Sequence, residues 1–167
     1  MKKCSVLIMV LLLTACGYHL RGTFDLPAGL KKVYLQGGSA PLREQFSKTL
    51  QGSSGQLVNS AGEAGITVRV FDADIKQRGV SLSAGGRSNE FELHYRLEYE
   101  LRDSANKVLL AREPLDIRRE YFNDQQDIIA KDNEEGVIRN EMYQQAVRGI
   151  LNRMRAVLET KPKPKFK

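Results

Sequence analysis

The feature that most restricts the fold of this chain is a strict alternation of apolar and polar residues between Glu90 and Arg102. The apolar positions are Phe91, Leu93, Tyr95, Leu97, Tyr99 and Leu101, and every residue between them is charged or histidine. Successive side chains of a strand point to opposite faces, so the pattern predicts a long strand with one buried and one solvated face. The buried face must be covered by another layer of the same domain.

Two more long strands are predicted around this one. An alternating stretch begins at Ile66, and a weaker extended pattern continues to Leu82. A third strand is predicted from Lys107 to Phe122, and Pro114 is a candidate position for a break because proline cannot donate to a strand ladder. Short loops join the three stretches, which predicts an antiparallel meander.

The remaining elements are a short strand and two helices. A strand is predicted over residues 30–36, and a helix begins near Pro41, where a missing N–H is tolerated, and ends near Gly52. Apolar residues at helical spacing predict a long helix from about residue 127 to 158, which we expect to cover the apolar face of the sheet. The predicted fold is α+β, with a four-stranded, largely antiparallel sheet and two helices packed on one face.

The N-terminus is typical of a bacterial lipoprotein precursor. A charged start, Met1 to Lys3, precedes an apolar run from Cys4 to Leu13, and two small residues then precede Cys16. A run of ten residues is too short for a membrane span, which needs roughly 20. We therefore expect residues 1–15 to be a cleaved signal and Cys16 to be lipidated, with Gly17 rather than Asp favouring the outer membrane. The alternative is an ordinary secretory signal that is cut elsewhere.

Cleavage after residue 15 would leave 152 of the 167 residues, enough for one domain with a sizeable core. We expect a lipidated tether over residues 16–29, a single domain over 30–158 and a disordered basic tail over 159–167, where prolines alternate with lysines. The formal charge of +6 would fall to +4 without Lys2 and Lys3. This excess favours anionic partners without specifying them, and a location outside the cytoplasm argues against nucleic acid.

The sequence offers little for catalysis. Its two histidines are His19 in the expected tether and His94 on the solvated strand face, so neither a histidine metal cluster nor a catalytic triad can be assembled. The glutamates on the same face alternate with basic residues, as on an ordinary solvated sheet. Gly85-Gly86 lacks the lysine and the strand-to-helix context of a phosphate loop and fits a turn. We expect no catalytic residue, no metal and no cofactor.

Four segments resemble one family. They are the run CGYHLRG at residues 16–22, YFN at 121–123, AKDNEE at 130–135 and RNEMY at 139–143. Together they are similar to the LptE family of lipopolysaccharide-assembly lipoproteins. The resemblance spans almost the whole chain after the signal, and the segments in the long helix are more discriminating than the lipidation motif, which occurs in many unrelated precursors.

The resemblance implies a four-stranded sheet with two helices on one face. It also implies an outer-membrane lipoprotein that plugs the β-barrel of its partner LptD, assists assembly of that barrel and binds lipopolysaccharide during its insertion into the outer leaflet. Family members bind this ligand through basic side chains, and the matching position is Lys131. Arg87 is a weaker candidate, because residues 83–87 depart from other members in length and sequence.

Each of these assignments has a plainer alternative. Lys131 would otherwise be a solvated helix lysine and Arg87 a solvated turn residue. Tyr18, Tyr121 and Phe122 are candidates for contact with the barrel wall, although packing in the core or tether is the more usual role for any one of them. For the protein as a whole, the alternatives are a structural outer-membrane lipoprotein without a ligand and a periplasmic enzyme.

The lipid anchor can be tested directly. Cys16→Ala should leave an uncleaved or mislocalised precursor, because the acyl chains that hold a lipoprotein on a bilayer would have no attachment site. Globomycin treatment with mass spectrometry of the mature N-terminus measures this. An unmodified Cys16, or a mature chain that begins elsewhere, would contradict the lipoprotein interpretation.

Overall fold

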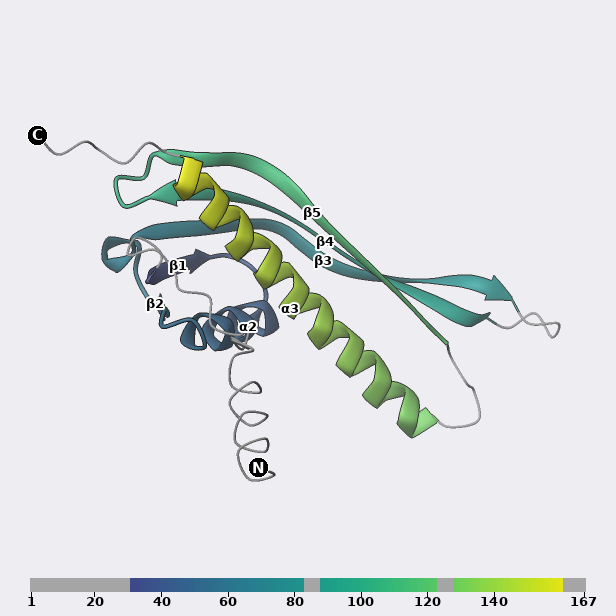
Figure 1. Ribbon diagram of the computed structural model, residues 1–167. Helices are drawn as coiled ribbons and strands as arrows, with labels where there is room; N and C mark the ends of the chain where they lie inside the picture. The colour runs from purple at the N-terminus through teal and green to yellow at the C-terminus, as the bar shows by residue number, and fades with distance from the viewer. Residues whose placement is uncertain (1–30, 83–87, 123–127, 161–167) are drawn as a thin grey trace, which may run out of the picture.

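The computed structural model describes residues 31–82, 88–122 and 128–160. The elements in chain order are β1 (Lys32–Gln36), α2 (Ala40–Gln51), β2 (Gln56–Val58), the 3-10 turn η2 (Ala61–Glu63), β3 (Ile66–Leu82), β4 (Ser88–Asp103), β5 (Val108–Phe122) and α3 (Ile128–Thr160). Figure 1 shows β3, β4 and β5 as a long twisted arm, with α2 and α3 on the same side of the sheet. The α+β class and the two helices are confirmed.

The sheet has five strands in the order β2-β1-β3-β4-β5. β3, β4 and β5 pair antiparallel, as the meander required, but β1 runs parallel to both β2 and β3. The prediction of four largely antiparallel strands is therefore wrong in two details. β2 has only three residues, too few to show an alternating pattern. Its parallel pairing with β1 depends on α2, which carries the chain back to the starting end of the sheet.

β5 runs through Pro114 without a break, and Pro114 lies opposite Glu98 of β4. β5 is an edge strand, which pairs on one side only. Proline is accommodated at such an edge because one set of backbone groups has no strand partner there. The candidate break was thus overridden by the position of the strand in the sheet.

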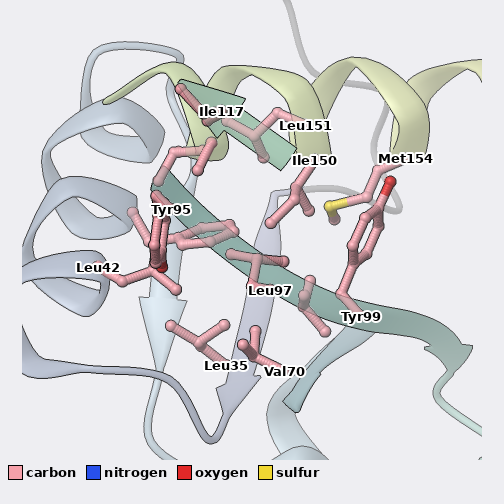
Figure 2. Close-up of a cluster of buried hydrophobic side chains, with 14 of the residues drawn as sticks. Leu35, Leu42, Val70, Tyr95, Leu97, Tyr99, Ile117, Ile150, Leu151 and Met154 are labelled. Carbon is pink, nitrogen blue, oxygen red and sulfur yellow. The ribbon is translucent and has the colours of Figure 1, made fainter. Parts of the chain in front are cut away.

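The core lies between the apolar face of the sheet and the two helices. Leu42, Phe46 and Leu50 form the buried stripe of α2, whose first turn is capped by the Ser39 hydroxyl, 3.4 Å from the Leu42 backbone nitrogen. Figure 2 shows the centre of this core, where side chains of β4 face those of α3. Its fully buried members on these two elements are Leu93, Leu97, Leu101, Met142, Ala146, Val147, Ile150 and Met154. The alternating apolar residues of β4 therefore do form one inward face.

Candidate functional surface

The face of the sheet that the helices leave uncovered is built from charged cross-strand rows. Three successive rows across β3, β4 and β5 are Arg78–Glu92–Glu120, Lys76–His94–Arg118 and Asp74–Arg96–Asp116. Directly opposite residues in antiparallel strands lie close enough for their side chains to interact. The rows therefore carry both signs of charge side by side, over the part of the sheet where the opposite face is apolar.

Several of these neighbours are ion pairs. Arg78 Nε lies 2.8 Å from Glu92 Oε1. His94 Nε2 lies 2.5 Å from Asp116 Oδ2, and Arg118 Nε lies 3.2 Å from Oδ1 of the same carboxylate. The hydrogen bond from His94, together with Arg118, lowers the pKa of Asp116. His94 was expected on the solvated strand face, and the structure confirms this position. It contacts a carboxylate there.

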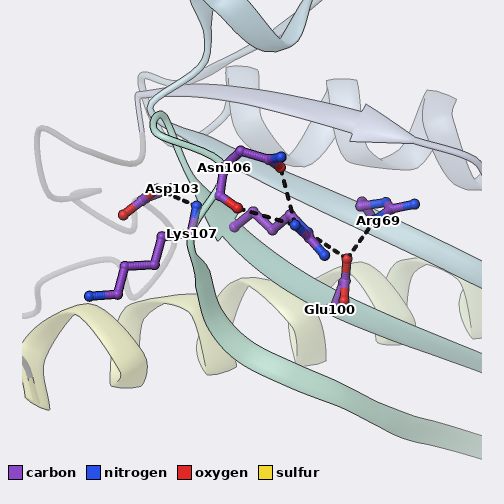
Figure 3. Close-up of polar contacts among 6 residues, drawn as sticks. Arg69, Glu100, Asp103, Asn106 and Lys107 are labelled. Carbon is purple, nitrogen blue, oxygen red and sulfur yellow. Dashed lines mark hydrogen bonds and ion pairs between the residues drawn. The ribbon is translucent and has the colours of Figure 1, made fainter.

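A second cluster lies near the turn between β4 and β5 (Figure 3). Glu100 Oε1 accepts from Arg102 Nε at 2.6 Å and from Arg69 at 3.0 Å. Arg102 also donates to the backbone oxygen of Asn106 at 3.1 Å, which ties the cluster to the turn. The hydrogen bond from Arg102 and the two guanidinium charges lower the pKa of Glu100, against the opposing effect of burial.

A β-bulge in β3 adds a third contact across the sheet. One extra residue on β3 shifts the register between Phe71 and Asp74, and Asp72 takes a positive φ of 45°. Asp72 Oδ2 pairs with Arg112 of β5 at 2.9 Å, and Arg112 also contacts Glu98 of β4. The Arg112 guanidinium stacks 4.4 Å from the centre of the Phe71 ring. The bulge thus helps to connect all three long strands on the uncovered face.

Beside the bulge lies a depression of about 530 Å³, lined by Asp72, Ala73, Asp74, Lys76, His94, Arg96 and Glu98. Apart from Ala73, the lining side chains named here are cations, carboxylates and His94. Its chemistry suits contact with a polar partner of mixed charge.

A separate polar cluster lies on the helix side, at the far end of the sheet. The Tyr121 hydroxyl donates to Glu135 Oε2 at 2.9 Å and accepts from Gln77 Nε2 at 2.6 Å. Arg139 pairs with the same carboxylate at 2.7 Å, and the Tyr121 ring stacks on Phe91 with centroids 5.8 Å apart. Three of the segments that carried the family resemblance therefore meet here, one at the end of β5 and two in α3.

The predicted site residues are only partly within reach of the structure. Lys131 belongs to the first turn of α3, but its side chain is not among those that the structure describes. Arg87 and Cys16 lie entirely outside the described residues. The ligand and lipid assignments therefore stay predictions. Of the aromatic candidates, Tyr121 is buried and Phe122 is 59% exposed, whereas Tyr18 lies outside the described residues. Gln77 was missed because nothing in its local sequence indicates a partner 44 residues away.

Within residues 31–82, 88–122 and 128–160, no helix combines the length and apolar character needed to cross a membrane. The same ranges contain no group of three or more His, Cys, Asp or Glu side chains arranged to hold a metal ion.

The fold is shared with lipoproteins of known structure. The NMR structure of an uncharacterized lipoprotein B from Nitrosomonas europaea matches with a TM-score of 0.69 and 27% identity, covering 86% of this chain and 94% of that chain. The crystal structure of the rare lipoprotein B from Shewanella oneidensis matches with a TM-score of 0.61 at 23% identity, covering 74% and 92%. The architecture is therefore that of a lipoprotein domain.

The sequence comparisons identify the family. The model of the LptE family, described as lipopolysaccharide-assembly, matches residues 30–154. The LPS-assembly lipoproteins LptE of Pectobacterium atrosepticum and Photorhabdus laumondii are 27% and 26% identical, over 88% and 90% of this chain and 80% and 82% of theirs. The chain belongs to the LptE family of lipoproteins involved in lipopolysaccharide assembly.

The Glu100 cluster leads to a prediction about acid stability. Because the pKa of Glu100 is lowered in the folded state, its stabilising contribution is complete above the ordinary value of 4.5 and is lost as the pH falls through the folded pKa. Glu100→Gln should lower the free energy of unfolding by roughly 1 kcal/mol at pH 7. The difference from wild type should shrink as the pH falls below 4.5. Urea unfolding across pH 3–7 measures both.

Glu44→Gln is the matched control, since Glu44 pairs with Lys48 on the exposed surface of α2. It should change the free energy of unfolding by less than about 0.5 kcal/mol. A gap between wild type and Glu100→Gln that stays constant down to pH 3 would contradict the assigned role of the carboxylate.

Proposed function

We propose that this protein is an outer-membrane lipoprotein, anchored through Cys16 on the periplasmic side, that plugs the LptD β-barrel and assists its assembly. In this proposal it binds lipopolysaccharide while the ligand is inserted into the outer leaflet. The observation that carries the proposal is the family match over residues 30–154, on a domain whose uncovered sheet face is charged throughout its centre. No enzymatic activity is part of the proposal.

The surface chemistry supports a plug. The interior of a large outer-membrane barrel is polar, so a protein lodged there needs a polar exterior. Within the part of the chain that the structure describes, the exposed large hydrophobic residues are Val80, Val108, Phe122 and Val137. The rows of mixed charge on the uncovered face can pair with a polar wall and favour one orientation of the domain, because like charges brought together are costly.

The topology supports a common location for the two proposed ligand contacts. The loop that contains Arg87 joins β3 to β4, where Leu82 lies opposite Ser88. β5 ends at this same end of the sheet, with Phe122 opposite Glu90, and α3 begins six residues later at Ile128. Lipid A carries phosphates, for which lysine offers a point charge and arginine a bidentate fork. One end of the domain would therefore supply both cations.

The second candidate function is a structural outer-membrane lipoprotein without a ligand. It would share the anchor and the fold. The mixed charge of the uncovered face is compatible with it, because that face suits a protein partner as well as it suits a plug. Lipopolysaccharide binding by the purified protein separates the two functions.

The assembly role predicts that the barrel depends on this chain. Depletion of this chain in cells should lower the amount of mature LptD and alter its oxidation state. A barrel that normally assembles around a plug has no template when the plug is absent. Immunoblots of outer membranes under reducing and non-reducing conditions measure this, and re-expression of the wild-type chain is the control. Normal amounts of correctly oxidised barrel after depletion would count against the partner.

The binding role predicts that charge reversal weakens capture of lipopolysaccharide. Lys131→Asp with Arg87→Asp should reduce capture at least several-fold, because each change removes an attraction to phosphate and adds a repulsion. The free energy of unfolding, followed by thermal melting, should change by no more than about 0.5 kcal/mol, as is usual for surface positions. Capture and melting are compared at matched ionic strength, because salt screens the attraction.

Lys48→Asp with Arg148→Asp is the matched control. It makes the same change in net charge at two exposed residues beside the groove between α2 and α3. Equal losses in both double variants would show that only net charge matters, and unchanged capture in the first would remove Lys131 and Arg87 from the site.

A further inference from the structure

The 33-residue helix α3 is held in two different ways along its length. From Met142 to Met154 its inward side chains are fully enclosed in the core. Among the described side chains from Glu134 to Glu141, by contrast, none is fully buried. Residues 134–141 therefore gain less from apolar burial, with Ile138 only partly buried against the core, and polar contacts also position this stretch.

Those contacts are polar and converge on one carboxylate. Glu135 accepts from the Tyr121 hydroxyl at 2.9 Å, and the same hydroxyl accepts from Gln77 at 2.6 Å. Arg139, one turn further along α3, pairs with Glu135 at 2.7 Å and keeps the carboxylate directed toward β5. The contacts join α3 to β5 over a separation of 14 residues, and β5 in turn to β3 over 44 residues.

The surroundings make these hydrogen bonds effective. Tyr121 is only 6% exposed and its ring stacks on Phe91 of β4. Burial and the neighbouring Glu135 raise the pKa of Tyr121 to about 12, so the phenol remains a donor at any physiological pH. If Glu135 were removed, the buried hydroxyl would lose its charged acceptor, which costs more than an exposed hydrogen bond.

The other end of α3 offers a chemically equivalent comparison. The Tyr99 hydroxyl donates to Glu113 at 2.6 Å, and Arg153 of α3 pairs with Glu113 at 3.1 Å. This group lies where α3 already packs in the core, beside Met154 (Figure 2). A tyrosine–glutamate–arginine contact there adds to a fully buried stretch of helix, whereas at Glu135 and Arg139 it joins a stretch in which no described side chain is fully buried.

We infer that Gln77, Tyr121 and Glu135 form a clasp that positions the first turns of α3, and with them Lys131, at the end of the sheet that carries the ligand contacts. Lys131 lies one helical turn before Glu135. If this end of the helix were in place for only part of the time, the apparent affinity for the ligand would fall in proportion to that fraction. The ligand part of this inference rests on the proposed function.

The structural part is tested by hydrogen exchange with mass spectrometry on the full chain. Tyr121→Phe should accelerate amide exchange in residues 128–140 about tenfold, since one charge-assisted hydrogen bond is lost, while residues 142–154 keep their protection. Glu135→Ala should do the same, and Glu135→Gln should restore part of the protection because its amide oxygen still accepts from Tyr121. Tyr99→Phe, the same chemical change at the other end, should leave residues 128–140 unchanged.

Unchanged exchange in both Tyr121→Phe and Glu135→Ala would overturn the clasp. Equal acceleration along the whole of α3, or the same acceleration in Tyr99→Phe, would also overturn it, because the contact would then be part of general packing.

The ligand part is tested by capture of purified lipopolysaccharide. Tyr121→Phe should weaken capture several-fold in the wild-type chain and cause no further loss in a Lys131→Ala background. A further loss in that background would overturn positioning of Lys131 by the clasp. If Lys131→Ala alone captures as well as wild type, the ligand role proposed for Lys131 fails, whereas localised exchange in Tyr121→Phe would still support the clasp itself.

Discussion

Burial of one face of the β3–β4–β5 meander is the interaction on which the rest of this structure depends. The inward residues of β4 alternate without interruption, and α2 and α3 close over them from the same side. The hydrophobic effect scales with apolar area removed from water, at about 25 cal/mol per Å², so the arrangement with both helices on one side satisfies every apolar stripe at once. The opposite face of the sheet is left without a covering layer.

The chemistry of the uncovered face follows from this one-sided packing. Each inward apolar residue places a polar neighbour outward, and three adjacent long strands turn those neighbours into rows. The rows form ion pairs such as Arg78 with Glu92, and the bulge at Asp72 adds Arg112 to the network. Exposed pairs such as Arg112 with Asp72 contribute little to stability. Their greater consequence is a charged surface that is suited to a polar partner.

The same packing limits how far the core can organise α3. Among the described side chains of α3, the fully buried ones run from Met142 to Met154, while the strands continue past them toward the end where Leu82 lies opposite Ser88. The first half of α3 follows the sheet into this region and is joined to it by Tyr121, Glu135 and Gln77. One stretch of α3 is thus enclosed in the core, and the stretch before it is joined to the sheet by polar contacts.

Local periodicity was sufficient to predict the meander, the inward face of β4 and the apolar stripes of both helices, because each depends on side-chain direction within one element. The start of α2 beside Pro41 was predictable because proline is tolerated in the first helical turn. The motif around Cys16 is likewise local, and together with the helical segments it led to the correct family.

Other features were decided only by the tertiary structure. β2 exists because α2 returns three residues to the edge of β1, and Pro114 is tolerated because β5 has no strand beyond it. The contact of Tyr121 with Gln77 and Glu135 joins three elements through a register that no local pattern contains. Such features depend on which strands become neighbours, and that choice is made by the packing of the whole core rather than by any one segment.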